Sequence, residues 1–202
     1  MLAKPGPIPI TKDWIFEPKM DGFRCLVCTH GGRFLARSRR GWDMTERVPE
    51  LGSRLPKDIQ LDGELIAWDE NGRPDWHLLG RRVLRRHDSI AVTLMVFDVL
   101  AVEGLSVMDQ PYSERRALLE TLEIERPGVQ LVATFEDGRT LFDVVCQQGL
   151  EGVVGKRLRD PYRPGERLWI KHKNRATRRF AEELARATAP RRLGRTASTQ
   201  SS

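Results

Sequence analysis

Short apolar runs rich in β-branched residues recur along the chain, separated by turns and polar segments. Runs of this kind predict strands. They cover residues 23–29, 34–37, 59–68, 90–100, 129–134, 152–157 and 167–173. Glycine-containing dipeptides between the runs predict turns at Gly31-Gly32, Asn71-Gly72 and Asp137-Gly138.

Three other segments have the signals of helices. Residues 74–86 form one candidate, Ser113 can cap a second that runs to Leu122, and Thr140 can open a third that ends near Gly149. Strands and helices are interspersed without regular βαβ spacing. The pattern therefore favours an α+β fold, with mixed and largely antiparallel sheets flanked by helices, over a doubly wound parallel sheet.

The composition is that of a soluble globular protein. Of the 202 residues, 40% are hydrophobic and 31% are charged, which is unlike a disordered chain. No apolar run approaches the roughly 20 residues that cross a bilayer, and the first residues lack the apolar segment of a secretory signal. We therefore expect a cytoplasmic protein without a membrane partner. Cys25 and Cys28 would point to opposite faces of their predicted strand, which argues against a shared zinc ion.

The formal net charge of +6 suggests an anionic partner, but the charge is unevenly distributed. Residues 174–202 hold seven arginines against two glutamates, a surplus of five, so residues 1–173 carry only about +1. We therefore predict a domain over residues 1–173 and a basic tail over residues 174–202, with a short helix followed by disorder. A phosphate site within the domain would depend on local charge, while the tail supplies the bulk excess.

Polar residues follow or interrupt the predicted strands in an ordered series. The first group places a lysine between an acid and a glycine, and by itself Lys-x-Asp-Gly is more typical of a surface turn. The series as a whole is much more specific. It consists of Glu17-Pro-Lys-Met-Asp-Gly-Phe-Arg24, Ser38-Arg-Arg-Gly41, Asp62-Gly-Glu64, Phe97-Asp98, Glu151-Gly-Val-Val-Gly-Lys156 and Trp169-Ile-Lys-His-Lys173.

This series resembles the nucleotidyltransferase motifs shared by ATP-dependent DNA ligases, RNA ligases and messenger-RNA capping enzymes, in the same order. The first and fifth groups look most like bacterial ATP-dependent DNA ligases associated with end joining and repair. The resemblance implies the nucleotidyltransferase fold of that family, which is ATP-grasp-like. It also implies that Lys19 attacks the α-phosphorus of ATP and forms lysyl-AMP. AMP would then pass to the 5′-phosphate at a DNA nick, and the 3′-hydroxyl would seal the nick.

The same resemblance implies roles for other residues. Glu64 would hold the ribose or a metal ion, and Glu151 would bind Mg²⁺ or Mn²⁺. Arg39 would contact the ribose and a neighbouring phosphate, while Arg24 would contact the nucleotide or the nick phosphate. An unperturbed lysine is almost wholly protonated at neutral pH, so the nucleophile needs nearby cations to favour its neutral form. The lysine pair expected to do this, and to neutralise the phosphates, is Lys171 and Lys173, which share a strand face.

Several candidates have a structural interpretation beside the functional one. Phe97 would stack on adenine, although a phenylalanine in an apolar run is by default part of the core. Glu17 lies where the family recognises adenine, but backbone atoms could do that work. A basic cluster on the predicted helix 74–86 could contact DNA phosphates or could be a solvated helix face. It comprises Arg81, Arg82, Arg85 and Arg86.

The chain departs from the ligase pattern after the last lysine group. Ligases of this kind continue into an oligonucleotide-binding (OB-fold) β-barrel, and the 29 residues after Lys173 have too little strand content to form one. Three alternatives follow: a minimal ligase acting on nicked duplex DNA as a monomer, half of a split enzyme that needs a partner OB-fold domain or repair proteins, or a truncated protein that binds ATP or DNA without turnover. An RNA ligase or a GTP-dependent capping enzyme is a further alternative.

Overall fold

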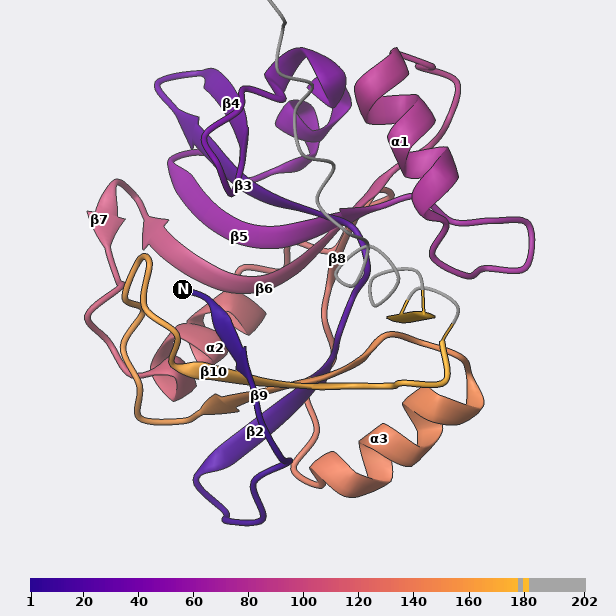
Figure 1. Ribbon diagram of the computed structural model, residues 1–202. Helices are drawn as coiled ribbons and strands as arrows, with labels where there is room; N and C mark the ends of the chain where they lie inside the picture. The colour runs from indigo at the N-terminus through magenta and orange to yellow at the C-terminus, as the bar shows by residue number, and fades with distance from the viewer. Residues whose placement is uncertain (178–179, 182–202) are drawn as a thin grey trace, which may run out of the picture.

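Two β-sheets and three α-helices make up the part of the chain that the computed structural model describes, residues 1–177 and 180–181. The larger sheet has the order β4-β3-β5-β6-β7, and β8 also pairs with β6. Its strands are β3 Phe23–His30, β4 Arg33–Ser38, β5 Ile59–Ile66, β6 Thr93–Val102, β7 Leu105–Ser106 and β8 Val129–Leu131. Figure 1 shows this sheet in the upper half of the molecule.

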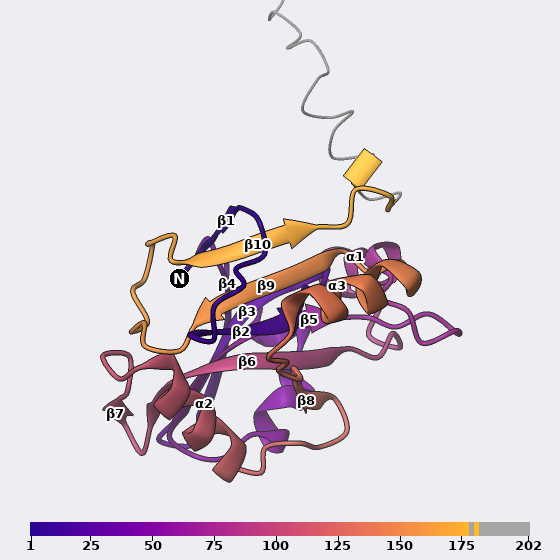
Figure 2. The same cartoon turned by 90° about the horizontal axis from the view of Figure 1, so that it is seen from below.

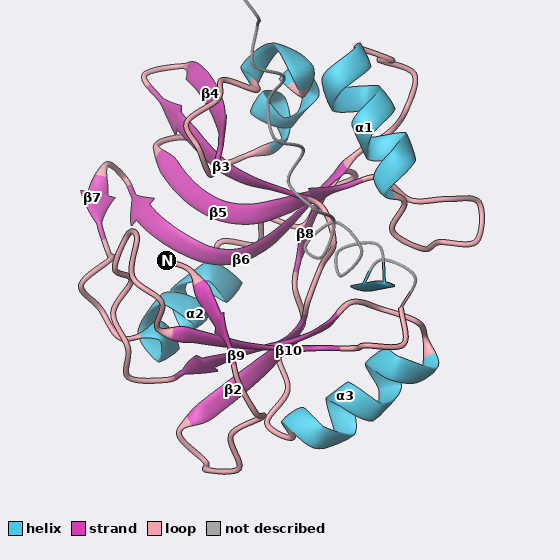
Figure 3. Cartoon of the chain, viewed as in Figure 1, coloured by secondary structure: helices cyan, strands magenta, loops and turns pink. Residues whose placement is uncertain are grey.

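The smaller sheet has the order β1-β10-β9-β2. Its strands are β1 Ala3–Pro5, β2 Trp14–Pro18, β9 Gly152–Arg157 and β10 Trp169–Lys173. Only β1 with β10 and β6 with β8 are parallel pairs among the described strands. The expected α+β fold with largely antiparallel sheets is therefore confirmed, and Figure 3 shows the strands and helices in separate colours.

The helices cover the outer parts of the two sheets (Figure 2). Helix α1 spans Trp76–Arg85 and packs on β5, α2 spans Tyr112–Thr121 and packs on β6, and α3 spans Gly138–Gln147 and packs on β2 and β9. Two short 3-10 helices, η1 Thr45–Arg47 and η2 Pro49–Arg54, cover β4. None of the helices in the described residues is long and apolar enough to cross a membrane.

The main core lies against the larger sheet. In β3, Cys25, Val27 and Thr29 are buried while their neighbours are more exposed, as the alternation of a strand requires. Cys25 and Cys28 therefore do point to opposite faces. A second cluster forms where α3 packs on the smaller sheet, around Trp14 and Phe16.

Some predicted strands, turns and helix ends differ from those in the structure, because tertiary contacts determine them. Strands β1, β2 and β7 were not predicted, and β2 is the strand that leads to Lys19. The Asp137-Gly138 pair is not a hairpin turn: the Asp137 carboxylate caps α3 by accepting from the backbone N–H of residues 139 and 140. Likewise α2 begins after Pro111 with no side-chain cap. The prediction of a short helix and then disorder after residue 173 falls mainly on residues outside the described part.

Candidate active site

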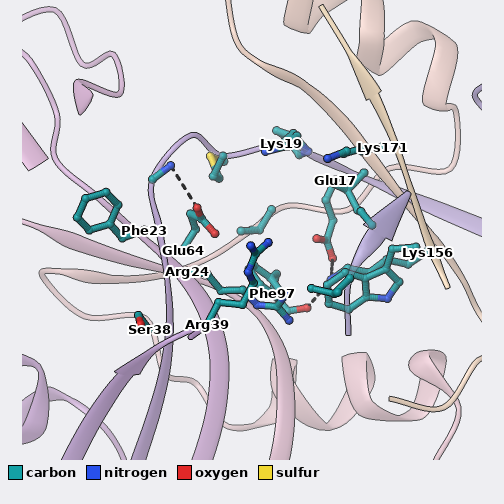
Figure 4. A pocket seen from close by; sticks show the side chains of 18 of the residues that line it. Glu17, Lys19, Phe23, Arg24, Ser38, Arg39, Glu64, Phe97, Lys156 and Lys171 are labelled. Atoms are coloured by element: carbon teal, nitrogen blue, oxygen red, sulfur yellow. Dashed lines mark hydrogen bonds and ion pairs between the residues drawn. The ribbon is translucent and has the colours of Figure 1, made fainter. Parts of the chain in front are cut away.

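A cavity of about 1040 Å³ opens between the two sheets. Both sheets contribute to its wall, together with the segment Lys19–Gly22 that joins them (Figure 4). Seven of the residues singled out from the sequence line it: Glu17, Lys19, Arg24, Arg39, Glu64, Phe97 and Lys171. The structure therefore brings together side chains that are more than 150 residues apart in the chain.

The nucleophile candidate is held by the carboxylate that was expected to bind metal. Lys19 Nζ lies 2.6 Å from Glu151 Oε2, and Lys173 Nζ lies 3.0 Å from Glu151 Oε1. The register of β9 produces this cluster, because the backbone N–H of Lys19 donates to Gly152 O at 2.8 Å and Lys173 pairs with Gly152 across the β9–β10 ladder. A side chain on each of three neighbouring segments thus converges at the start of β9.

Gly152 is required at this convergence. Its φ of 150° lies outside the range that side chains prefer, and a Cβ there would lie 2.2 Å from the backbone oxygen of His172. Only a residue without a side chain lets β9 and β10 approach closely beside Glu151. This accounts for the glycine that follows Glu151 in the sequence.

Glu64 faces the cavity from the larger sheet. Its Oε1 accepts a hydrogen bond from the backbone N–H of Gly22 at 3.2 Å. Burial raises the pKa of Glu64 to about 7, against the opposing charges of Lys19 and Arg24. A carboxyl group with this pKa lies close to its point of ionisation at neutral pH, so a bound cation would readily shift it to the charged form.

Arg24 has a different environment from the one that the resemblance implied. It lines the cavity, but its guanidinium is engaged with Asp62: Nε donates to one carboxylate oxygen at 2.9 Å and Nη2 donates to the other. It also donates to the backbone oxygen of Met1 and to the hydroxyl of Tyr162. Arg24 is therefore oriented by Asp62 of the larger sheet at the wall of the cavity.

One end of the cavity is built around Phe97 and a buried lysine. Lys156 is 1% exposed, and its Nζ lies 2.7 Å from Glu17 Oε1 and 2.8 Å from the backbone oxygen of Phe97 (Figure 4). The same ammonium lies 4.6 to 4.9 Å from three ring centroids, those of Phe97, Tyr112 and Trp169. Burial raises the pKa of Glu17, while the charge and hydrogen bond of Lys156 oppose that rise.

Lys156 and Tyr112 are the residues that the sequence analysis missed as site residues. Lys156 ends a quoted motif, and a lysine in an otherwise apolar strand is a signal that a buried partner exists. No sequence signal marks Tyr112 as a partner of Glu17, because the two are 95 residues apart. Asp98, which follows Phe97 in β6, pairs with Arg115 inside the core.

The four arginines of the basic cluster do not all lie on the exposed face of α1. Arg81 and Arg85 are exposed, whereas Arg82 is 3% exposed and binds the carboxylates of Glu50 and Asp88. Arg82 is therefore a core residue and not part of a DNA-binding face, which corrects the prediction for this residue. Arg86 is exposed and lies 3.4 Å from Glu46.

The rim of the cavity carries exposed arginines. Arg39 and Arg40 follow β4, and Arg167 precedes β10 on the opposite sheet. Trp42, which is 40% exposed, lies beside the first two. Cationic groups on both sides of a cavity opening favour the entry of an anionic ligand.

A lysine paired with a carboxylate at a cavity between two sheets, with a second carboxylate, two further lysines and aromatic rings around it, is suited to the chemistry of covalent nucleotidyltransferases. Comparison with known proteins narrows this class. Residues 1–173 match the family model described as ATP dependent DNA ligase domain. The chain belongs to this family, as an ATP-dependent DNA ligase adenylation domain.

Individual relatives agree with this assignment. The chain is 36% identical over 180 residues to the multifunctional non-homologous end joining protein LigD of Pseudomonas aeruginosa, covering 85% of this chain and 21% of that protein. It is 37% identical over 171 residues to a DNA ligase of Methanocorpusculum labreanum, covering 78% of this chain and 31% of that protein. The chain thus spans between a fifth and a third of the length of these two relatives.

A solved structure supports the same assignment. Mycobacterial DNA ligase D, in a complex with ATP and MES, superposes with a TM-score of 0.74 at 32% identity, covering 86% of this chain and 59% of that one. The nucleotidyltransferase fold expected from the sequence motifs is therefore confirmed.

Proposed function

We propose that Lys19 takes AMP from ATP and that the chain passes this AMP to the 5′-phosphate at a nick in duplex DNA, which the 3′-hydroxyl then seals. The observation that carries the proposal is the position of Lys19. Its Nζ is paired with Glu151 at 2.6 Å in the segment that lines the cavity between the two sheets. ATP-dependent ligation requires a lysine in such a place, with room for a nucleotide beside it.

The first step is a displacement at the α-phosphorus. The lone pair of Lys19 Nζ forms the N–P bond, the bond from this phosphorus to the bridging oxygen breaks, and pyrophosphate leaves with the electron pair. Nζ must lose a proton before it attacks, and Glu151 Oε2 is an acceptor within hydrogen-bond reach. Lys171, which lines the cavity, and Lys173, which is paired with Glu151, would neutralise the phosphates.

Two further displacements complete the proposed reaction. An oxygen of the DNA 5′-phosphate attacks the same phosphorus, the N–P bond breaks and Lys19 regains its amine. The 3′-hydroxyl then attacks the activated 5′-phosphorus, AMP leaves with the electron pair, and the hydroxyl proton is released.

The base of ATP would occupy the end of the cavity next to Phe97. Phe97 offers a ring face for stacking, and Glu17 offers a carboxylate oxygen that can accept from the amino group of adenine. Arg39 would contact the ribose or a phosphate from the rim.

The carboxylates fit a divalent cation of the Mg²⁺ or Mn²⁺ type. Glu64 and Glu151 are close enough for the charge of Glu151 to help raise the pKa of Glu64, and this mutual repulsion is relieved by a cation. No group of three or more acidic, histidine or cysteine side chains with metal-site geometry occurs in the described residues. This is consistent with Mg²⁺, which keeps several waters and uses substrate phosphates as ligands. When bound, the ion would polarise the phosphate oxygens.

Nicked duplex DNA is the proposed substrate, and its phosphates would contact exposed arginines. Arg81, Arg85 and Arg86 on α1 and the rim residues Arg39 and Arg40 are available at the surface. A separate OB-fold domain, or repair proteins that carry one, would be the partner that closes the cavity over ATP. We propose that the chain itself acts as a monomer.

Labelling with ATP that carries ³²P at the α-phosphate tests the first step. Wild-type protein should gain covalent label with Mg²⁺ that survives alkali and is released by hot acid, as an N–P bond requires, Lys19→Ala should gain none, and the exposed Lys12→Ala should match wild type. Label that remains in Lys19→Ala would refute the assignment of the nucleophile. Adding nicked DNA to the labelled protein should discharge the label and seal the nick, with nicked RNA as the comparison. Label without discharge, even with an added OB-fold domain, would limit the function to adenylylation.

A further inference from the structure

Two donors converge on one oxygen of Glu17. Lys156 Nζ and Tyr112 Oη each lie 2.7 Å from Glu17 Oε1. All three side chains are nearly inaccessible to solvent. The carboxylate is thus fixed through a single oxygen, among buried side chains.

The other oxygen of Glu17 is open to the cavity. Within the described part of the chain, no group donates to Oε2, and Oε2 is not among the buried polar atoms that lack a hydrogen bond. Since Glu17 lines the cavity, this oxygen is the one that can meet a base. A carboxylate oxygen only accepts hydrogen bonds, so it can recognise only a hydrogen-bond donor on the base.

Lys156 can donate hydrogen bonds but cannot accept them. An ammonium has three N–H donors and no acceptor, and this one is held by the backbone oxygen of Phe97 and by three aromatic rings. Whatever residue stands at position 17 must therefore present an acceptor to Lys156. Tyr112 is less restrictive, because a hydroxyl can donate or accept.

We propose that Lys156 is a specificity-determining residue: it fixes which hydrogen-bonding group residue 17 turns toward the base, and thereby the 6-substituent of the purine that the site accepts. The inference rests on the proposed function, in that the base lies beside Glu17. With glutamate, the cavity-facing atom is an acceptor, and it selects the 6-amino group of adenine over the 6-oxo group of guanine or hypoxanthine.

Glutamine at position 17 gives the decisive contrast. Its amide can be placed in two orientations, but only one presents the carbonyl oxygen to Lys156. The NH₂ group must then face the cavity, where it donates to a 6-oxo group and repels a 6-amino group. Glu17→Gln should therefore shift the preference from adenine toward hypoxanthine, rather than merely weaken adenine binding.

ATP and ITP provide the matched pair of nucleotides, because they differ only at purine positions 1 and 6. Binding of the fluorescent 2′/3′-methylanthraniloyl forms and the rate of Lys19 labelling should both be measured. Wild type should prefer ATP by roughly 10- to 100-fold, since a buried polar group left unpaired costs about 1–3 kcal/mol. Glu17→Gln should lower this ratio by at least about tenfold.

Second-site variants in the Glu17→Gln background test whether Lys156, and not a general change in the pocket, sets the nucleotide preference. Lys156→Met frees the amide to take either orientation, so the ATP to ITP ratio should return close to one. Lys156→Arg retains a donor-only group and should keep the shifted preference, as should Tyr112→Phe. Thermal melting checks that each variant is folded, and the arginine variant gives a test that does not depend on the methionine variant.

The outcomes are distinct. An unchanged ATP to ITP ratio in Glu17→Gln, or the same ratio in Glu17→Gln with and without Lys156→Met, would overturn the inference. Discrimination in binding without any Lys19 label would support the inference and count against the proposed function. Failure of wild type to bind either nucleotide would overturn both.

Discussion

The replacement Arg115→Met should be among the most damaging single changes to the fold. Arg115 lies on α2 with its side chain fully buried. Its Nε and Nη2 donate to the two carboxylate oxygens of Asp98 at 2.8 and 3.0 Å. Its Nη1 donates to the backbone oxygens of Gln110 and Asp160 at 2.6 and 3.1 Å. Methionine keeps most of the length and removes all four hydrogen bonds.

The expected loss of stability comes from the Asp98 carboxylate, which would stay buried without its partner. Asp98 would remain a buried carboxylate, and among the described residues its one other hydrogen bond comes from the backbone N–H of Val99, at 3.0 Å. Removing one partner of a buried ion pair typically costs about 3–5 kcal/mol, out of a total stability of roughly 5–15 kcal/mol. In urea this corresponds to a fall in the unfolding midpoint of roughly 1–3 M.

Equilibrium unfolding in urea, followed by tryptophan fluorescence, measures this change. Arg139→Met on the exposed face of α3 is the matched control and should stay within about 0.5 kcal/mol of wild type. The double replacement of Asp98 by Leu and Arg115 by Met should recover part of the loss, because it leaves no buried charge. A loss below about 1 kcal/mol for Arg115→Met, or a double variant as unstable as the sum of the single variants, would refute the reasoning.

Three other perturbations have directions set by the structure. Because the folded pKa of Glu64 is raised from 4.5 to about 7, the native state binds more protons than the unfolded state between these values. Without divalent cations, wild-type stability should therefore fall as pH rises through this range, by up to about 3 kcal/mol, and Glu64→Gln should lose that slope; equal slopes in pH-dependent urea titrations would contradict this. Gly152→Ala should abolish labelling and destabilise the protein, whereas Gly80→Ala, with open space around its Cβ, should be neutral or stabilising by up to about 1 kcal/mol in the same assays. Arg82→Met should lower the urea midpoint without a direct effect on DNA affinity. Arg85→Met should leave the midpoint unchanged and reduce the salt dependence of DNA binding by about one phosphate contact. The reverse result would refute the assignment of Arg82 to the core and of Arg85 to the DNA-binding surface.

Local patterns were sufficient for the elements that are regular in sequence. Alternation and β-branched content located β3, β5 and β9 closely, and the helix over 74–86 became α1 with an Asp75 cap. The motif order also singled out Lys19 and other residues that the fold brings to one cavity, and their catalytic roles stay predictions.

Long-range polar contacts could not be derived from local patterns. β2 is short, and its buried Glu17 breaks the expected alternation of apolar and polar positions because Lys156 satisfies it from 139 residues away. Arg115 looks like a solvated helix residue until Asp98 is placed against it. The start of α3 depends on Gly138, where a Cβ would lie 2.7 Å from the ring of Phe16. Each of these features exists only once separate strands and helices have packed against one another.

The two sheets are joined by more buried contacts at the end of the cavity next to Phe97 than beside Lys19. Lys156 of the smaller sheet donates to Phe97 O of the larger one, and Tyr162, just before β10, donates to Asp62 of β5 at 2.8 Å. These links join the two sheets through buried groups with several partners each, so moving the sheets apart would expose unpaired charge. At the start of β9, by contrast, Lys19 and Glu151 are joined through one partly exposed ion pair. Under the proposed function, substrate phosphates and a cation would exchange with that pair, and each charge would gain a new partner when it loses the old one.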